Sequence, residues 1–181
     1  MQFERWHRAG RAVELFIDVS AKQLADPEFL DVLAPVIVRL RVAGSSLWLK
    51  LRAGELQSAS DTTRAALQTL AAAGARIIVG GLGSGGVETT TLKGLRVEAL
   101  AFDAALIGTD QAPQAGTAKA RLIVRLGANM SVPVMVEGVI DESQHAIATQ
   151  LGCTSGNGPL YGGPTLGDHL DFSGSGMSRR T

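Results

Sequence analysis

A single acidic residue follows a buried-type apolar run, and it is the first candidate for chemistry in this sequence. Residues 132–136 have the β-branched bias of a buried parallel strand, and Glu137 comes directly after them. Parallel α/β folds place catalytic and ligand-binding groups at such strand ends. From Asp141 the apolar spacing becomes helical, and Gly152 stands where a helix C-cap belongs. The alternative interpretation is that Glu137 only caps this following helix.

A glycine-rich segment offers a second kind of chemistry, the binding of a nucleotide. Residues 81–86 fit the pattern G-x-G-x-x-G, whose glycines are Gly81, Gly83 and Gly86. They follow the apolar run 77–79, and Asp103 ends the next run about 20 residues later, which is the outline of a dinucleotide fingerprint. The helix that this motif requires would span 87–95, where three consecutive threonines and a glycine disfavour it. Nucleotide binding through this loop is therefore the weaker hypothesis.

Other catalytic patterns are not met. Ser84 lacks the preceding glycine of a G-x-S-x-G turn, and no two histidines have the spacing of a zinc-binding helix. Cys153 is the only cysteine, which excludes an internal disulfide and a zinc site built from several cysteines. A reducing, cytoplasmic setting is expected.

The candidate residues have to be positioned by an alternation of strands and helices. Apolar runs typical of strands occupy residues 15–19, 47–51, 77–79, 97–102 and 132–136, with Leu160 and Tyr161 as a sixth candidate. Helical spacing covers residues 27–41, 62–73, 119–128 and the segment from Asp141, with Ser20 and Asp61 as N-caps. This alternation indicates parallel βα units. The strand at 15–19 reads as a buried, central one.

The composition limits the class of protein. The 181 residues suffice for one domain, and 45% are apolar although only 4% are aromatic. Lys plus Arg and Asp plus Glu balance at 17 each, which argues against nucleic acid and anionic membrane as partners. No apolar run approaches the roughly 18 residues of a membrane span. We expect one domain over residues 1–172 and a flexible tail over 173–181.

The glutamate segment also resembles a known family. Residues 136–144 read V-E-G-V-I-D-E-S-Q, residues 151–158 read L-G-C-T-S-G-N-G, and Gly163-Pro164 follows. This resembles the end of an EAL domain, the cyclic di-GMP phosphodiesterase family, which reads roughly A-E-G-V-E-T-x-x-Q, then L-G-C-x-x-x-Q-G-Y and a proline. The resemblance extends back to about His7 and covers most of the chain.

The resemblance implies a site of two divalent metals at the C-terminal mouth of a (β/α)8 barrel, held by carboxylates and an asparagine. Asp18 stands for the asparagine ligand of the family's V-N-x-S strand end. Lys50 stands for the first glutamate of E-L-T-E, which puts a cation where a metal would bind. Gly80 and Gly81 stand for the two metal-binding aspartates of D-D-F-G-T-G.

The remaining motifs are partly kept. Ala101 replaces the catalytic lysine of the family's K-I-D strand end, whereas Asp103 matches its aspartate. Glu137 matches the first glutamate of E-G-V-E and Ile140 replaces the second. Asn157 stands for the glutamine of Q-G-Y, and the E-A-L tripeptide itself is absent together with the first two barrel strands.

The sequence therefore predicts an incomplete (β/α) TIM-type barrel of about six strands, EAL-like and catalytically inactive, with no cofactor, no metal and no catalytic residue. Its expected role is that of a regulatory or protein-interaction module in bacterial cyclic di-GMP-type signalling. One alternative is a domain that binds cyclic di-GMP or a dinucleotide without hydrolysis. Another is a fragment whose missing strands come from a second chain.

Two structural expectations follow from the resemblance. The strand ends at Asp18, Lys50, Gly80, Asp103 and Glu137 should ring one mouth, with Lys50 paired to an acid. The gap left by the missing strands should make residues 15–19 an edge that is covered by a protein partner or by a homodimer contact.

Overall fold

The chain forms two compact units. The computed structural model describes residues 2–83, 89–108 and 114–169. The first unit comprises residues 1–80 and 87–98, and the second comprises 81–86 and 99–181. The expected tail at 173–181 lies outside the described residues.

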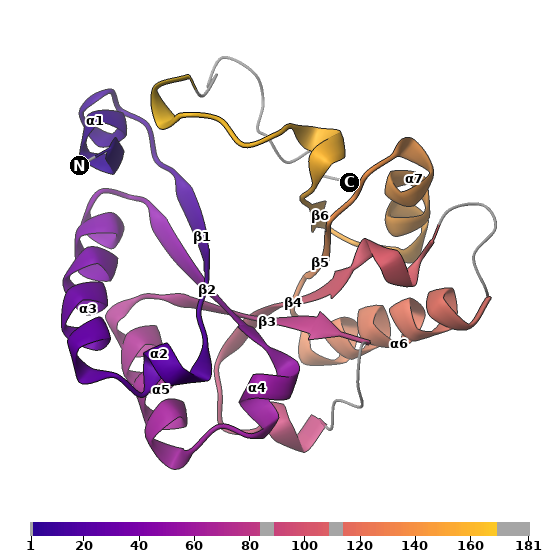
Figure 1. Ribbon diagram of the computed structural model, residues 1–181, viewed down its shortest axis with the longest axis horizontal. Helices are drawn as coiled ribbons and strands as arrows, with labels where there is room; N and C mark the ends of the chain where they lie inside the picture. Colours follow the sequence, from indigo (N-terminus) through magenta and orange to yellow (C-terminus); the bar gives the residue numbers. More distant parts are fainter. Residues whose placement is uncertain (1, 84–88, 109–113, 170–181) are drawn as a thin grey trace. The chain divides into compact units, whose positions relative to one another are not determined.

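The first unit contains three parallel strands in the order β1, β2, β3. Their bounds are Glu14–Asp18, Ser46–Arg52 and Arg76–Leu82, although the last two residues of β3 belong to the second unit. The helices of this unit are α1 (Gln2–Arg8), α2 (Ala21–Leu24), α3 (Pro27–Val42), α4 (Ala53–Gln57), α5 (Asp61–Ala73) and the 3-10 helix η1 (Thr89–Leu92). Figure 1 shows α2, α3 and α5 gathered beside the β1–β2 pair.

Local sequence explains where α3 and α5 begin and end. The Asp26 carboxylate accepts a hydrogen bond from the backbone N–H of Glu28, and Pro27 occupies the first helical position of α3. Ser60, and not the predicted Asp61, caps α5 by accepting from the Thr63 N–H, because its side chain lies one residue outside the first turn. α5 stops at Gly74, whose left-handed φ of 112° suits glycine.

The second unit contains the parallel strands β4, β5 and β6 in that order. Their bounds are Val97–Asp103, Val134–Glu137 and Ser155–Gly156, and the first two residues of β4 belong to the first unit. The α-helices here are α6 (Gln114–Met130) and α7 (Glu142–Leu151), with 3-10 helices η2 (Ala104–Leu106), η3 (Pro159–Tyr161) and η4 (Gly167–His169). Helices α6 and α7 pack against each other, and α6 packs on β5 (Figure 1).

Two expectations about elements are wrong. The sixth strand is β6, whereas Leu160 and Tyr161 lie in η3, which Pro159 starts. The strand predicted at 15–19 is not buried: the side chains of β1 alternate between exposed and half-buried because β1 pairs only with β2 among the described strands. The described part of 87–95 forms the 3-10 helix η1 and not the α-helix that a dinucleotide motif requires, which agrees with the threonines and glycine that disfavour such a helix.

None of the described helices has the length and apolarity needed to cross a membrane.

Candidate functional site

The strand ends of the first unit join an acid to a base. Asp18 closes β1 and lies opposite Lys50 of β2 in the parallel register. The Lys50 Nζ is 2.9 Å from the Asp18 Oδ1, with the lysine side chain 22% exposed and the aspartate side chain 77% exposed. Lys50 thus pairs with an acid, as expected for a cation at this strand end. Asp18 is left with its carboxylate neutralised by a protein group.

The loop that follows β1 is held by a residue that sequence reasoning missed. The Glu55 Oε2 of α4 accepts a hydrogen bond of 2.7 Å from the backbone N–H of Ala21, the first residue of α2. Ser20 and Gln23 cap the same helix reciprocally in a capping box. A carboxylate at a helix N-terminus satisfies an otherwise unpaired N–H. Because Glu55 and Ala21 are 34 residues apart, no local pattern could have found this contact.

The glycines at and after the carboxyl end of β3 supply no side-chain ligand. Gly80 lies in β3 opposite Arg52 of β2, and Gly81 follows it with a positive φ of 67°. A Cβ added at Gly83 would collide with the Leu106 side chain, so this glycine lies against a packed apolar group. Gly86, the last glycine of the predicted nucleotide motif, lies outside the described residues.

The strand ends of the second unit place two acids side by side. Asp103 closes β4 and lies opposite Glu137, the last residue of β5. The Asp103 carboxylate also accepts a hydrogen bond of 2.8 Å from the Ala105 N–H, and so caps η2. Glu137 does not cap the helix after it: that cap is Asp141, which accepts from the Gln144 N–H at 2.8 Å. This bond, and then the Ser143 hydroxyl, lower the pKa of Asp141 from its ordinary value.

Asn157 ties the loop after β5 to the end of β6. Its side-chain oxygen accepts from the Gly138 N–H at 3.3 Å, and its backbone carbonyl accepts from the Val139 N–H at 3.0 Å. A Cβ at Gly158 would collide with the backbone of Val139, so only glycine fits this approach. Asn157 therefore holds the loop that begins immediately after Glu137.

A cluster of charged and aromatic side chains crosses the first unit near the amino ends of its strands, and no sequence pattern predicts it. The Arg76 guanidinium lies 3.9 Å from the centre of a Trp48 ring and donates to Glu98 at 2.8 Å and to Glu14 at 3.3 Å. Phe16 lies opposite Trp48 in the register of β1 and β2, and the two side-chain rings stack with centroids 5.4 Å apart. These five residues come from four strands, and their contacts appear only once the register is known.

The site residues therefore fall into two groups. Asp18 and Lys50 meet in the first unit, and Asp103, Glu137 and Asn157 surround one loop in the second. That all of these strand ends ring a single mouth stays a prediction. In the part of the chain that the structure describes, no group of three or more His, Cys, Asp and Glu side chains could hold a metal ion.

Parallel strands joined through helices, with polar residues at their carboxyl ends, define a (β/α) protein of barrel type. The family model of the EAL domain matches residues 1–164 and so spans both units. The chain belongs to the EAL domain family.

Known proteins agree with this assignment. The chain is 28% identical over 170 residues to the bifunctional diguanylate cyclase/cyclic di-GMP phosphodiesterase MucR of Pseudomonas aeruginosa, covering 93% of this chain and 25% of MucR. The structure of the PaMucR phosphodiesterase in complex with c-di-GMP matches with a TM-score of 0.74 over 88% of this chain and 69% of that one. The EAL domain of Mycobacterium smegmatis DcpA is 25% identical and matches with a TM-score of 0.79 over 92% of this chain and 75% of that one.

These structures confirm the predicted fold class, an α/β incomplete TIM-type barrel of EAL type. The chain spans about a quarter of the length of the curated relatives it matches, with 25% of MucR covered.

Proposed function

We propose that this chain is a catalytically inactive EAL-like domain that works as a regulatory or protein-interaction module in cyclic di-GMP-type signalling. The observation that carries the proposal is the ion pair between Lys50 and Asp18. Its setting is proposed to be the cytoplasm, on the sequence argument from the single cysteine.

The residues at the strand ends do not fit the pair of divalent metals that the family resemblance implies. The ammonium group of Lys50 is within 2.9 Å of Asp18, so a divalent cation bound by Asp18 would have to displace it or tolerate its charge. Gly80 and Gly81 have no side-chain oxygen, and Ala101 has no amine at the position of the catalytic lysine. Metal-assisted hydrolysis needs several hard oxygen ligands at one point. No hydrolytic step is therefore assigned to this site.

The direct test is hydrolysis of cyclic di-GMP in the presence of magnesium or manganese, followed by chromatography of the linear product. We expect turnover no higher than that of a buffer blank. A matched preparation of a protein carrying Lys50→Ala should show the same lack of turnover, because the glycines still supply no ligands. Metal-dependent turnover by the unmodified chain that scales with its concentration would overturn the proposal.

An alternative function is binding of cyclic di-GMP without hydrolysis. Two observations favour it: Asp103, Glu137 and Asn157 keep polar groups around one loop, and the PaMucR relative was solved with c-di-GMP. Calorimetry with cyclic di-GMP, with and without a divalent metal, distinguishes the alternatives. Saturable binding that is weakened by Asn157→Ala but unaffected by metal would favour the nucleotide-binding function.

The partner is proposed to contact the edge of β1. Phe16 is 48% exposed on this strand, and β1 has a neighbour strand on only one side among the described residues. Edge strands with exposed apolar side chains invite pairing with another chain. Hydrogen exchange of the β1 amides tests this contact: protection that depends on protein concentration or on an added partner supports it, and fast exchange under all conditions contradicts it.

A further inference from the structure

Helix α3 exposes an apolar face that no described residue covers. Of the seven large hydrophobic residues with substantial exposure in the described part of the chain, three lie on this helix: Val32 at 71%, Val38 at 49% and Val42 at 83%. Its opposite face is buried through Leu33, Ile37 and Leu40, so the helix is already anchored to its own unit. The exposed valines are therefore a second apolar face.

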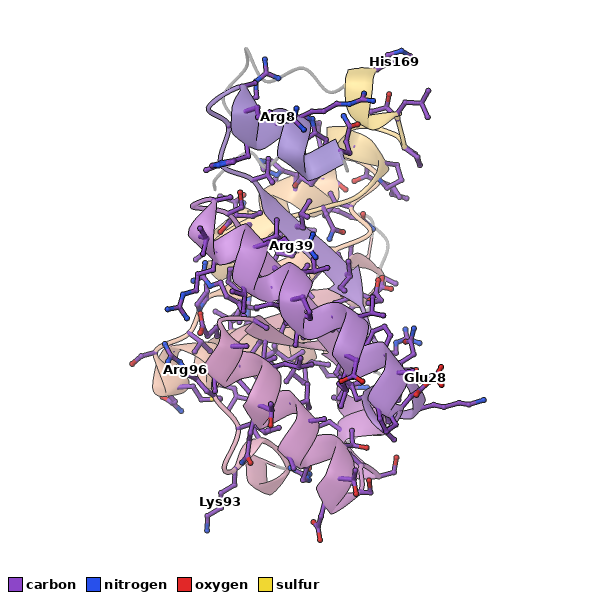
Figure 2. All side chains as sticks on the ribbon, turned by 90° about the vertical axis from the view of Figure 1, so that its left-hand side faces the viewer. Arg8, Glu28, Arg39, Lys93, Arg96 and His169 are labelled. Carbon is purple, nitrogen blue, oxygen red and sulfur yellow. The ribbon has the colours of Figure 1, made fainter. Side chains whose placement is uncertain are left out.

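This α3 outer face has a regular composition, and we define it by its residues: Glu28, Asp31, Val32, Pro35, Val38, Arg39 and Val42. All seven are exposed. Residues 28, 31, 35, 38 and 42 follow one another in alternating steps of three and four, the spacing of a seam between two packed helices. Figure 2 shows α3 on the side turned to the viewer, with Glu28 and Arg39 toward its two ends.

The central part of the face, from Asp31 to Arg39, is complementary to a copy of itself about Pro35, whereas Glu28 falls opposite Val42 at the two ends. In an antiparallel pair with a two-fold axis at Pro35, Asp31 lies opposite Arg39 and Val32 lies opposite Val38. Each pairing then occurs twice, so that two acid–base contacts flank an apolar centre. Pro35 itself meets its own copy, and its compact ring has no long side chain to separate the two helices.

The charged residues of this face are available for such contacts. The side chains of Asp31 and Arg39 make no ion pair or hydrogen bond to any residue that the structure describes. Arg41 differs, because its side chain lies against Gly74 at the end of α5. Arg39, whose side chain is left available, is thus the basic residue that the two-fold axis at Pro35 places opposite Asp31.

We propose that the α3 outer face is a homodimer interface, occupied by the same face of a second copy of this chain in antiparallel orientation. The proposal commits to a second copy because the centre of the face is complementary to itself: Asp31 falls opposite Arg39, and Val32 falls opposite Val38. It is independent of the proposed function and of the β1 edge, since neither cyclic di-GMP nor β1 takes part in it.

Charge reversal tests the pairing directly by sedimentation equilibrium of the whole chain, at concentrations up to about 100 μM because a contact confined to one helix is small. Asp31→Arg alone and Arg39→Asp alone should each weaken the dimer more than tenfold, since each creates two like-charge contacts. An equimolar mixture of these two variants should dimerise again, because every contact in the mixed pair is then between opposite charges. Leu122→Glu, on the 62% exposed Leu122 of α6, is the control and should leave the dimer unchanged.

Restoration in the mixture keeps the test valid even if one variant is less stable, and circular dichroism of each variant checks its folding. A second measurement uses Pro35→Cys, which places a thiol on the two-fold axis. Mild oxidation should link two copies through this position, whereas Leu122→Cys should not. A monomeric wild-type chain over the whole concentration range, a dimer indifferent to both reversals, or a mixture that stays monomeric would overturn the proposal.

Discussion

In each of the strand pairs β1–β2 and β4–β5, an aspartate at the end of one strand lies opposite a charged residue of the other strand. The two pairs differ in the sign of that second charge and in how far their side chains are buried. Asp18 meets Lys50 at the end of the first pair, whereas Asp103 lies beside a second acid, Glu137, at the end of the other. The first pair carries an internal cation, and the second keeps two carboxylates in register. The two strand pairs therefore present opposite electrostatics at their carboxyl ends: an acid paired with a base in the first unit and two acids side by side in the second.

Burial separates the same two strand pairs. Phe16 of β1 is 48% exposed, whereas Phe102 of β4 is fully buried at 0%. Both are phenylalanines within a β-strand, so residue type alone does not distinguish them. The number of neighbouring strands and helices around each strand decides how much of it is buried.

The largest expected effect tests this difference in burial. Phe102→Ala should lower the free energy of unfolding by about 3–5 kcal/mol, because it removes a large side chain from a packed core. Phe16→Ala is the matched control and should lose only about 1 kcal/mol, mainly its stacking on Trp48. Urea unfolding followed by circular dichroism measures both values. Similar losses for the two variants would mean that β1 is as well covered as β4.

A smaller effect is expected from making the first strand pair resemble the second. Lys50→Glu places two carboxylates side by side and should destabilise the chain more than the neutral Lys50→Met does. Because the Asp18 side chain is 77% exposed, Lys50→Met should lose no more than about 1 kcal/mol. The difference between the two variants in free energy of unfolding should shrink in about 1 M salt, where the screening length falls to about 3 Å. If the difference is unchanged by salt, then packing of the lysine stem and not charge explains the contact.

The smallest effect concerns Cys153, which follows α7 in the second unit. Burial raises the pKa of its thiol from 9.0 to about 11. The unfolded chain therefore loses this proton first, and stability should fall as the pH rises from about 9 to 11, with no contribution below that window. Cys153→Ala should remove this part of the alkaline slope, which is read from the difference between its pH–stability curve and that of the wild type. Parallel curves would show that the thiol is accessible to water.

The elements of the fold were largely predictable because their signals are local. Apolar runs identified the first five strands, and the glycines at 74 and 152 marked helix ends that the structure confirms as left-handed caps. The sixth strand was missed because Ser155 and Gly156 carry no apolar pattern. It exists through its backbone pairing with Met135 and Val136, which a sequence pattern does not report.

In the candidate site, a contact was predictable from the sequence only where the type of one residue was enough to indicate its partner. The pairing of Lys50 with an acid followed from a cation placed at a strand end among carboxylates. The contacts of Arg76 with Trp48 and Glu98 could not be predicted, because they depend on the register between strands. The same holds for the position of Asn157 beside Gly138, which lies 19 residues earlier in the chain.

The hydrogen bond from Ala21 to Glu55 has a consequence for the order in which the chain is assembled. During synthesis, β1, α2 and α3 leave the ribosome before Glu55 does, so α2 begins with only the caps from its own neighbourhood. Its first N–H finds the Glu55 carboxylate 34 residues later, once the second strand and α4 have been made. The βα unit formed by β1 and α2 is therefore completed by the next one, and a nascent chain stalled before Glu55 would hold α2 less firmly.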